Sequence, residues 1–352
     1  MVVAVHRLQE SAKLPSSSAY LGEEPNMSII LVADIGGTNG RFGLVNACTH
    51  GKGYNAEKQI SLASGDYPTL ADMIRDYVKQ ADVPMPKFAC LAIAGPIQDG
   101  HVKVTNLNWE FSISKLRDEL NMQALDVIND YSALAYAAPH LQANDKKTLY
   151  SKDANPYAPI GVMGPGTGFG AALLAPVSNG WKIIPTEGGH CSFAPTTDTE
   201  IAILQEMRKQ HDHVSIEHLL SGQGLVSIYR SIAVIEGAEA EDLSPADVSA
   251  RGMKHQDPLC EQALQSFCNI LGSVAGDKAL SWGAMGGIYL GGGIVPKIAD
   301  YLPQTDFIKR YLNKGIMRGY VEDIPVHMVT NDKAALIGSA AWLVDTTQAL
   351  QS

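Results

Sequence analysis

The sequence predicts an α/β protein with two domains that hold a ligand between them. Two short apolar runs, residues 29–33 and 42–45, flank residues 34–41, and a connection this short joins paired strands as a hairpin. A second hairpin with a glycine-rich tip is predicted around residues 164–170, in the other half of the chain. Two similar hairpins in the two halves indicate a duplicated architecture that grips one ligand from both sides.

The tip of the first hairpin differs from the common phosphate loops. Walker A and Rossmann loops run from a strand into a helix, whereas no helical pattern begins at Arg41 and no Gly-Lys-Ser/Thr follows. Its glycines let backbone N–H groups approach an anion, and Thr38 and Asn39 add side-chain donors. Alone, this turn is equally consistent with an ordinary tight hairpin. A third glycine cluster, residues 291–293, precedes Pro296, which suits a first helical turn, and three such loops in order are a strong indication.

Composition bounds the class of protein. The 352 residues suffice for about two domains, each with its own core. A formal net charge of −10 leaves no basic excess to neutralise phosphates, which argues against nucleic acid as the main partner. No apolar run approaches the length of a membrane span, and no signal-peptide core is present. The five cysteines form no CxxC pair, and their odd number without a signal peptide indicates reduced thiols in the cytoplasm. Cys260 and Cys268 fall in an apolar helical pattern typical of a core.

Residues 1–27 are expected to form an N-terminal extension. Pro15, Pro25 and a serine run interrupt this stretch, it shows no sustained periodicity, and Met27 would make a natural start directly before the first strand.

The first half alternates strands with helices. An apolar i, i+3, i+4, i+7, i+8 stripe over residues 70–78 predicts a helix facing the core. Residues 88–94 read as a buried strand, and residues 125–128 as another that ends at Asn129 and Asp130. Ligand groups at strand ends, followed by a helix over residues 131–138, are typical of α/β proteins. The remaining predicted elements are an edge hairpin at 101–104 and a helix capped by Ser112 that runs through Leu120.

Helix starts dominate the second half. Thr197 and Glu200 have capping-box spacing before a helix over residues 201–210. Ser215 is expected to cap a short helix that carries Glu217, broken by glycines before the next helix. The other predicted elements are a strand at 181–184, breaks at Gly222 and Gly224, helices starting at Ser244-Pro245 and Asp257-Pro258 (the latter through Leu280), a strand at 324–329 and a closing helix at about 333–342.

Six motifs, in order along the chain, resemble those of bacterial glucokinases of the hexokinase type. The resemblance covers roughly residues 28–346 and extends to the superfamily shared with actin and the heat-shock chaperone ATPases. The matching stretches are Asp-Ile-Gly-Gly-Thr-Asn at 34–39, Val-Ile-Asn-Asp-Tyr at 127–131, Gly-Pro-Gly-Thr-Gly at 164–168, Glu-Gly-Gly-His at 187–190, His-Val-Ser-Ile-Glu at 213–217 and Leu-Gly-Gly-Gly-Ile-Val-Pro at 290–296.

The resemblance implies a two-domain actin-like ATPase (ribonuclease H-like) fold with an interdomain cleft. The small α/β domain would span residues 28–138 plus about 331–352, and the large α/β domain residues 139–330. The implied activity is transfer of the γ-phosphoryl group of ATP to the 6-hydroxyl of D-glucose, with Mg²⁺, in a cytoplasmic homodimer. The alternatives are a kinase for another hexose or amino sugar, or an actin- or chaperone-like regulatory ATPase, which would lack sugar-binding carboxylates.

The resemblance also assigns site residues. Asp130 falls where the family has its catalytic aspartate, and Asp34 would hold Mg²⁺ directly or through water. The sugar-binding residues would be Asn129, Asp130, Glu187, His190, Glu217 and Asn106. The nucleotide-binding residues would be Ala33, Asp34, Ile35, Gly36, Gly37, Thr38, Asn39, Gly166, Thr167, Gly168, Gly291 and Gly292.

Several of these side chains have plainer alternatives. Phosphoryl transfer needs an acceptor for the hydroxyl proton, and Asp130 suits this role, but an aspartate before a helix usually caps it. Asp34 is equally a turn former, His190 a structural histidine and Trp109 a core residue. Carboxylates, imidazole and amide are nevertheless the groups that hold sugar hydroxyls.

A zinc site is not expected. Related sugar kinases and repressors carry a cysteine-rich zinc cluster after the motif at 187–190, whereas here only Cys191 follows and no Cys-x-Cys-Gly run comes after it. Zinc needs about four ligands. The chain therefore resembles the zinc-free branch.

Overall fold

The computed structural model describes residues 29–47, 53–95, 97–104, 107, 109–178 and 180–350. The expected N-terminal extension at 1–27 and the predicted site residue Asn106 lie outside the described residues. None of the helices within these ranges combines the length and apolar character needed to cross a bilayer.

The first sheet has five strands in the order β3-β2-β1-β4-β8. The predicted hairpin is confirmed: β1 and β2 pair antiparallel, with Asp34 opposite Arg41. β1, β4 and β8 are parallel, and their registers place Ile35, Ile93 and Asn129 in line at the carboxyl ends. Every residue of β4 is buried, which explains its continuous apolar run. The strands are β1 (Ile29–Ile35), β2 (Asn39–Asn46), β3 (Glu57–Ala63), β4 (Phe88–Ile93) and β8 (Ala124–Asn129).

The second sheet repeats this plan. Its order is β12-β11-β10-β13-β14-β9, in which β10 pairs antiparallel with β11 and parallel with β13. A central strand thus has a hairpin on one side and parallel strands on the other in both sheets, as the two glycine-tipped hairpins predicted. The strands are β9 (Lys146–Tyr150), β10 (Ile160–Pro165), β11 (Phe169–Val177), β12 (Gly180–Thr186), β13 (Ile288–Leu290) and β14 (Val326–Val329).

One face of the first sheet is covered by α1 (Leu70–Ala81), whose predicted apolar stripe is buried. The Phe42 and Tyr77 rings stack there with centroids 5.1 Å apart. Trp109 is 5% exposed and its Nε1 donates to the Tyr67 carbonyl, so it is a core residue. The other elements here are α2 (Ile113–Glu119) and a small sheet of β5 (Ile97–Gln98), β6 (His101–Val104) and β7 (Trp109–Ser112).

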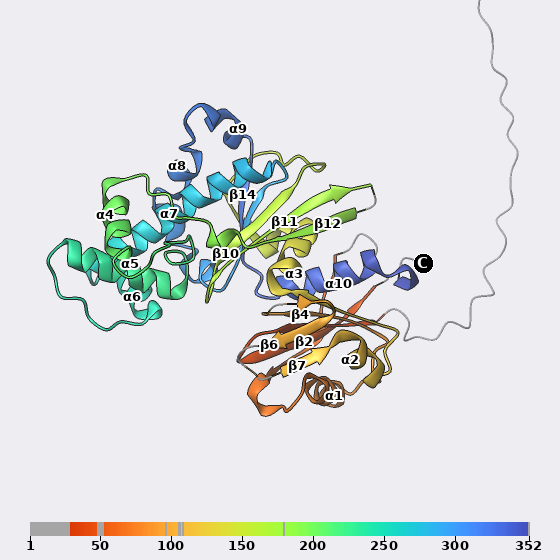
Figure 1. The fold of residues 1–352 in the computed structure, drawn as a ribbon. Helices are drawn as coiled ribbons and strands as arrows, with labels where there is room; N and C mark the ends of the chain where they lie inside the picture. The colour runs from red at the N-terminus through yellow and green to blue at the C-terminus, as the bar shows by residue number, and fades with distance from the viewer. Residues whose placement is uncertain are drawn as a thin grey trace, which may run out of the picture.

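A group of helices packs beside the second sheet (Figure 1). The longest, α7, buries Cys260 and Cys268 as predicted. These helices are α4 (Asp198–Met207), α5 (Gly222–Ile235), α6 (Pro245–Met253), α7 (Pro258–Trp282), α8 (Phe307–Leu312) and α9 (Arg318–Glu322).

Two local predictions in this half are wrong, and a third is confirmed in part. No helix forms at Ser215, where the chain makes a turn, and the glycines at 222 and 224 start α5 because Ser221 caps it. Pro296 lies in a first helical turn as predicted, although the element at 295–298 is a single 3₁₀ turn. Glu200 does not complete a capping box with Thr197, because its carboxylate is drawn instead to Arg310, 2.6 Å away.

Helices α3 (Asp130–Ala137) and α10 (Ala334–Thr346) lie between the two sheets (Figure 1). They cross closely because Gly338 lacks a side chain: a Cβ there would overlap the Ala133 carbonyl. α10 contacts β1 and β4, whereas α3 contacts β10, β11 and β12. The pair therefore connects the two halves, and the first turn of α3 lies at the carboxyl end of β8.

Candidate active site

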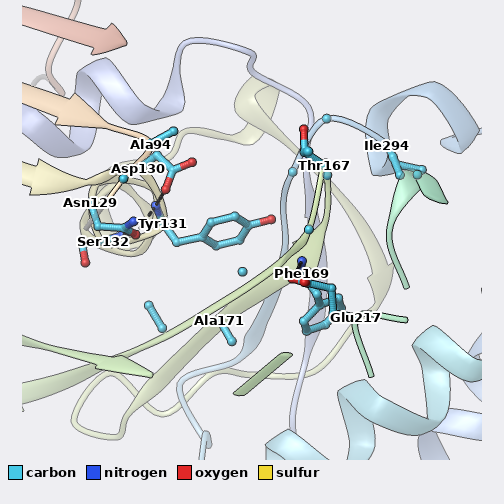
Figure 2. Close-up of a pocket in the computed structure, with 18 of the residues that line it drawn as sticks. Ala94, Asn129, Asp130, Tyr131, Ser132, Thr167, Phe169, Ala171, Glu217 and Ile294 are labelled. Carbon is cyan, nitrogen blue, oxygen red and sulfur yellow. Dashed lines mark hydrogen bonds between the residues drawn. The ribbon is translucent and has the colours of Figure 1, made fainter. Parts of the chain in front are cut away.

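A cleft of about 1390 Å³ is lined by residues from both halves of the chain. From the first half come the loop after β4 and the junction of β8 with α3, and from the second half the tip of the β10–β11 hairpin and the third glycine loop. Predicted site residues in its lining are Asn129, Asp130, Gly166, Thr167, Gly168, Glu187, Glu217 and Gly292. Figure 2 shows Asn129 and Asp130 facing the hairpin tip that carries Thr167 and Phe169.

Asn129, and not Asp130, is the N-cap of α3. The Asn129 Oδ1 accepts hydrogen bonds from the backbone N–H groups of Tyr131, at 2.9 Å, and Ser132, at 3.4 Å. Asp130 is the first residue of the helix and its Oδ1 accepts from the Tyr131 N–H at 2.9 Å. Helix capping therefore does not require a carboxylate at position 130.

Two acidic groups, Asp34 and Asp130, lie at the carboxyl ends of β1 and β8, which flank β4 in the sheet. Burial, together with the negative charge of Asp130, raises the pKa of Asp34 to about 6, and Arg41 opposes the shift. Burial also raises the pKa of Asp130, an effect opposed by the hydrogen bond from the Tyr131 backbone. Arg41 itself pairs with Asp332 at 3.1 Å. Two partly buried carboxylates that repel each other form an environment that favours a cation.

The donor chemistry at Asp34 fits Mg²⁺. The described part of the chain contains no group of three or more His, Cys, Asp or Glu side chains placed to hold a metal ion. Mg²⁺ does not need one, because it is commonly held by one or two carboxylates together with substrate phosphates.

Glu217 supports the tip of the second hairpin. Its Oε2 accepts a hydrogen bond from the backbone N–H of Phe169 at 2.7 Å, and a Cβ on Gly168 would overlap this carboxylate. The Glu217 N–H donates to the Gly189 carbonyl at 2.9 Å, which joins the turn at 215–219 to the 3₁₀ turn Gly188–His190. Two motifs separated in sequence are thus held together by backbone hydrogen bonds.

The other predicted residues lie outside the lining of the cleft. His190 is exposed and its carbonyl accepts from His213 Nε2 at 3.0 Å. Gly291 is buried against β10, where its N–H donates to the Met163 carbonyl. The first hairpin tip is held by Ser64, whose Oγ donates to the Gly36 carbonyl at 3.1 Å. The predicted residues of this tip are Ala33, Asp34, Ile35, Gly36, Gly37, Thr38 and Asn39.

Sequence reasoning missed Tyr131 as a residue of the cleft. Its ring projects from the start of α3 toward the second hairpin (Figure 2), and its hydroxyl donates to the Gly164 carbonyl. Its position directly after Asp130 was the available indication, because residues that open a helix beside a functional carboxylate share its surroundings. Lys297 and Ser244 also line the cleft and were not predicted.

Comparisons with known proteins point to one family over most of the chain. A family model described as Glucokinase matches residues 31–346. The chain is 41% identical over 313 residues to a glucokinase of Saccharophagus degradans, covering 89% of this chain and 97% of that protein. A crystal structure of a glucokinase from an Antarctic psychrotroph is 41% identical, with a TM-score of 0.86 and coverage of 91% of this chain and 99% of that one.

A more distant structure shares the fold. A ROK family glucokinase from Streptomyces griseus, solved in complex with glucose and AMPPNP, is 18% identical, with a TM-score of 0.60 and coverage of 90% of this chain and 99% of that one. The architecture is the two-domain actin-like ATPase fold. With the family model spanning nearly all of the described chain, the protein belongs to the glucokinase family.

Proposed function

We propose that this protein is an ATP:D-glucose 6-phosphotransferase. The observation that carries the proposal is the composition of the cleft, in which Asp130 at the end of β8 faces the glycine tip at 166–168, with Glu187 and Glu217 in the same lining. Sugar phosphorylation needs a carboxylate that accepts the proton of the reacting hydroxyl and backbone N–H groups that bind the phosphates. It also needs carboxylates that bind the other hydroxyls of the sugar.

The nucleotide would be held by the three glycine loops. In the second hairpin the Gly166 N–H donates to the Gly168 carbonyl at 2.7 Å, so the tip is a tight turn braced from within. In the third loop Gly292 has φ +85°, a conformation that other residues rarely adopt. Gly291, which lies against β10, would support the third loop. The tip at residues 33–39 would bind the nucleotide from the other half of the chain. These loops let the backbone come close to phosphate oxygens.

The sugar would lie between the two halves. Asn129 keeps its Oδ1 on the helix cap, so its amide NH₂ is the group it can offer to a hydroxyl. Glu217 has one oxygen on the Phe169 N–H and the other for the sugar. Glu187 and His190, joined to Glu217 through the turn Gly188–His190, complete the set. A site of this kind rejects sugars that lack a hydroxyl, since its polar groups would be left unpaired.

Asp130 would accept the proton of the 6-hydroxyl as that oxygen attacks the γ-phosphoryl group. Burial raises its pKa, which makes it a better proton acceptor than an exposed aspartate. Mg²⁺, held by Asp34 and the phosphates, would supply charge stabilisation for the transferring group. Asp34 would act directly or through water.

Closure of the cleft would bring the first tip to the phosphates. Residues 33–39 do not line the cleft, although β1 and β8 end at the same edge of the sheet. We propose that residues 28–138 with about 331–352 form the small domain and residues 139–330 the large one. Rotation of one against the other would enclose glucose and exclude water.

A coupled assay of ADP formation over a panel of hexoses and amino sugars tests the function. Glucose should give the highest kcat/KM, and omission of sugar should leave only slow ATP hydrolysis. Preference for another sugar would select the alternative kinase, and sugar-independent turnover would select a regulatory ATPase. We propose a cytoplasmic location, which the proposed use of ATP supports. The homodimer stays a prediction, for light scattering on the purified protein to test.

A further inference from the structure

Tyr131 connects the helix that carries Asp130 to the second hairpin. It is the second residue of α3, and its Oη donates to the carbonyl of Gly164 in β10. Its ring fills the space beside Gly170, where a Cβ would overlap the ring atoms. Figure 2 shows this ring reaching from the Asp130 side of the cleft toward the hairpin tip.

The same face of α3 contacts the third glycine loop. A Cβ on Gly292 would lie 2.6 Å from Tyr131 Oη, and one on Gly291 would overlap the side chain of Leu134, one turn further along the helix. The two loops are joined to each other, because the Gly291 N–H donates to the Met163 carbonyl at 2.9 Å. The Tyr131 and Leu134 side chains therefore rest on both glycine loops of the second half.

The backbone N–H of Tyr131 binds the side chains at the start of α3. Its N–H donates to Asp130 Oδ1 and to Asn129 Oδ1, each at 2.9 Å. One residue thus binds a loop carbonyl through its hydroxyl and the Asp130 carboxylate through its N–H. A shift of the glycine loops that moves the ring must move this N–H as well, because a phenol ring is rigid and packed side chains transmit displacement.

We propose that Tyr131 is a positioning residue that couples nucleotide binding to the placement of Asp130. The proposal rests on the proposed function, since it takes the glycine loops as the nucleotide site and Asp130 as the base. Nucleotide on the loops would hold Gly164 and Gly292 in place, and the Tyr131 hydroxyl would then fix the first turn of α3. Misplacement of a catalytic group by about 1 Å is enough to cost a large part of the rate.

Tyr131→Phe tests the hydroxyl while keeping the ring against Gly170. We expect kcat to fall and KM for ATP to rise, each by about 5- to 100-fold, the range for leaving a buried acceptor unpaired. The dissociation constant for glucose measured without nucleotide should change by less than about twofold, because the sugar-binding side chains are untouched. A general loss of stability would not weaken the use of ATP while leaving the affinity for glucose unchanged.

Tyr136→Phe is the matched control. Tyr136 lies on the same helix, and its hydroxyl donates to Asp345 Oδ2 at 2.5 Å, outside the lining of the cleft. The Tyr136→Phe variant should have a lower melting temperature than the wild type, whereas its kcat and its KM for ATP should stay near the wild-type values. If Tyr131→Phe has the same kinetics as Tyr136→Phe, the coupling role is refuted.

Titration with a non-hydrolysable ATP analogue separates this inference from the proposed function. Weaker binding of the analogue to Tyr131→Phe than to Tyr136→Phe supports the contact even if wild type phosphorylates no hexose, an outcome that would refute the function alone. Equal binding together with normal glucose phosphorylation refutes the inference alone. Should Tyr131→Phe unfold, Gly170→Ala, which displaces the ring, must reproduce the nucleotide-selective defect, and a defect in glucose binding instead would count against the role.

Discussion

The carboxylate of Glu217 accepts a hydrogen bond from the backbone N–H of Phe169 at 2.7 Å, so a residue of the proposed sugar site also holds the tip of the proposed phosphate-binding hairpin. The two residues are 48 positions apart in the sequence. The proposed sugar and nucleotide sites would therefore share one side chain.

Glu217→Ala should raise KM for both glucose and ATP, each by about tenfold or more, because it removes a charged acceptor from two partners. Glu187→Ala, with no hydrogen bond from its side chain to the described part of the hairpin, should raise KM for glucose alone. Glu217→Gln can still accept the Phe169 N–H through its amide oxygen, so it should restore KM for ATP but not for glucose. Steady-state kinetics with each substrate varied would decide, and an unchanged KM for ATP in Glu217→Ala would show that the hydrogen bond is unimportant.

Asp130→Asn should lower kcat by about 10²–10⁴-fold, the usual contribution of a positioned base, while glucose binding falls much less. Stability should be preserved, because Asn129 caps α3 and asparagine is tolerated in the first turn. Kinetics and calorimetric titration with glucose provide the comparison. A folded Asp130→Asn enzyme with near-normal turnover would mean that another group takes the proton.

Removal of Mg²⁺ with EDTA should abolish activity, and added Mg²⁺ should restore it, because ATP phosphates and Asp34 would share the ion. A zinc-selective chelator should leave activity intact, since no Cys-x-Cys-Gly run follows Cys191. Elemental analysis of the purified, active enzyme is the companion measurement. One equivalent of zinc there would contradict the expectation.

Acid should destabilise the protein partly through His327. Burial, with the nearby Lys146 ammonium, lowers its pKa from 6.5 to about 4, and its Nδ1 lies 3.0 Å from Thr148 Oγ1. The unfolded chain therefore takes up this proton first, so the contribution to stability is complete above pH 6.5 and is lost as pH falls toward 4. Urea unfolding across this interval should show a shallower loss in His327→Gln than in wild type. His101→Gln, at an exposed histidine on β6, is the control, and identical slopes in all three proteins would rule out this role.

Glucose alone should reduce the radius of gyration measured by solution scattering, because the proposed domains close on the sugar. The Asp130→Asn enzyme should close as well, since it retains the other hydroxyl-binding groups. An unchanged scattering curve at saturating glucose would argue against closure driven by sugar.

Local errors in the sequence predictions have identifiable causes. The expected helix at Ser215 is only a turn, closed by the Leu220 N–H on the Ile216 carbonyl, and the N–H groups of Ile216 and Glu217 donate to the carbonyls of Cys191 and Gly189 in another segment. Glu200 does not complete the capping box because its carboxylate accepts a hydrogen bond from the buried guanidinium of Arg310, which belongs to a helix distant in the sequence. The strand β9 was not predicted, and it forms because the edge of β14 offers it hydrogen bonds.

The sequence by itself determined both glycine-tipped hairpins, the alternation of strands and helices and the position of Asp130 after a strand, because turn chemistry and hydrophobic periodicity act over a few residues. Only the tertiary structure decided that Asn129 takes the helix cap, that Glu217 holds the Phe169 N–H and that Tyr131 rests on two glycine loops. The contacts of Glu217 and Tyr131 join residues tens of positions apart. Their partners become adjacent only when two sheets, each built around its own hairpin, pack against the same pair of central helices.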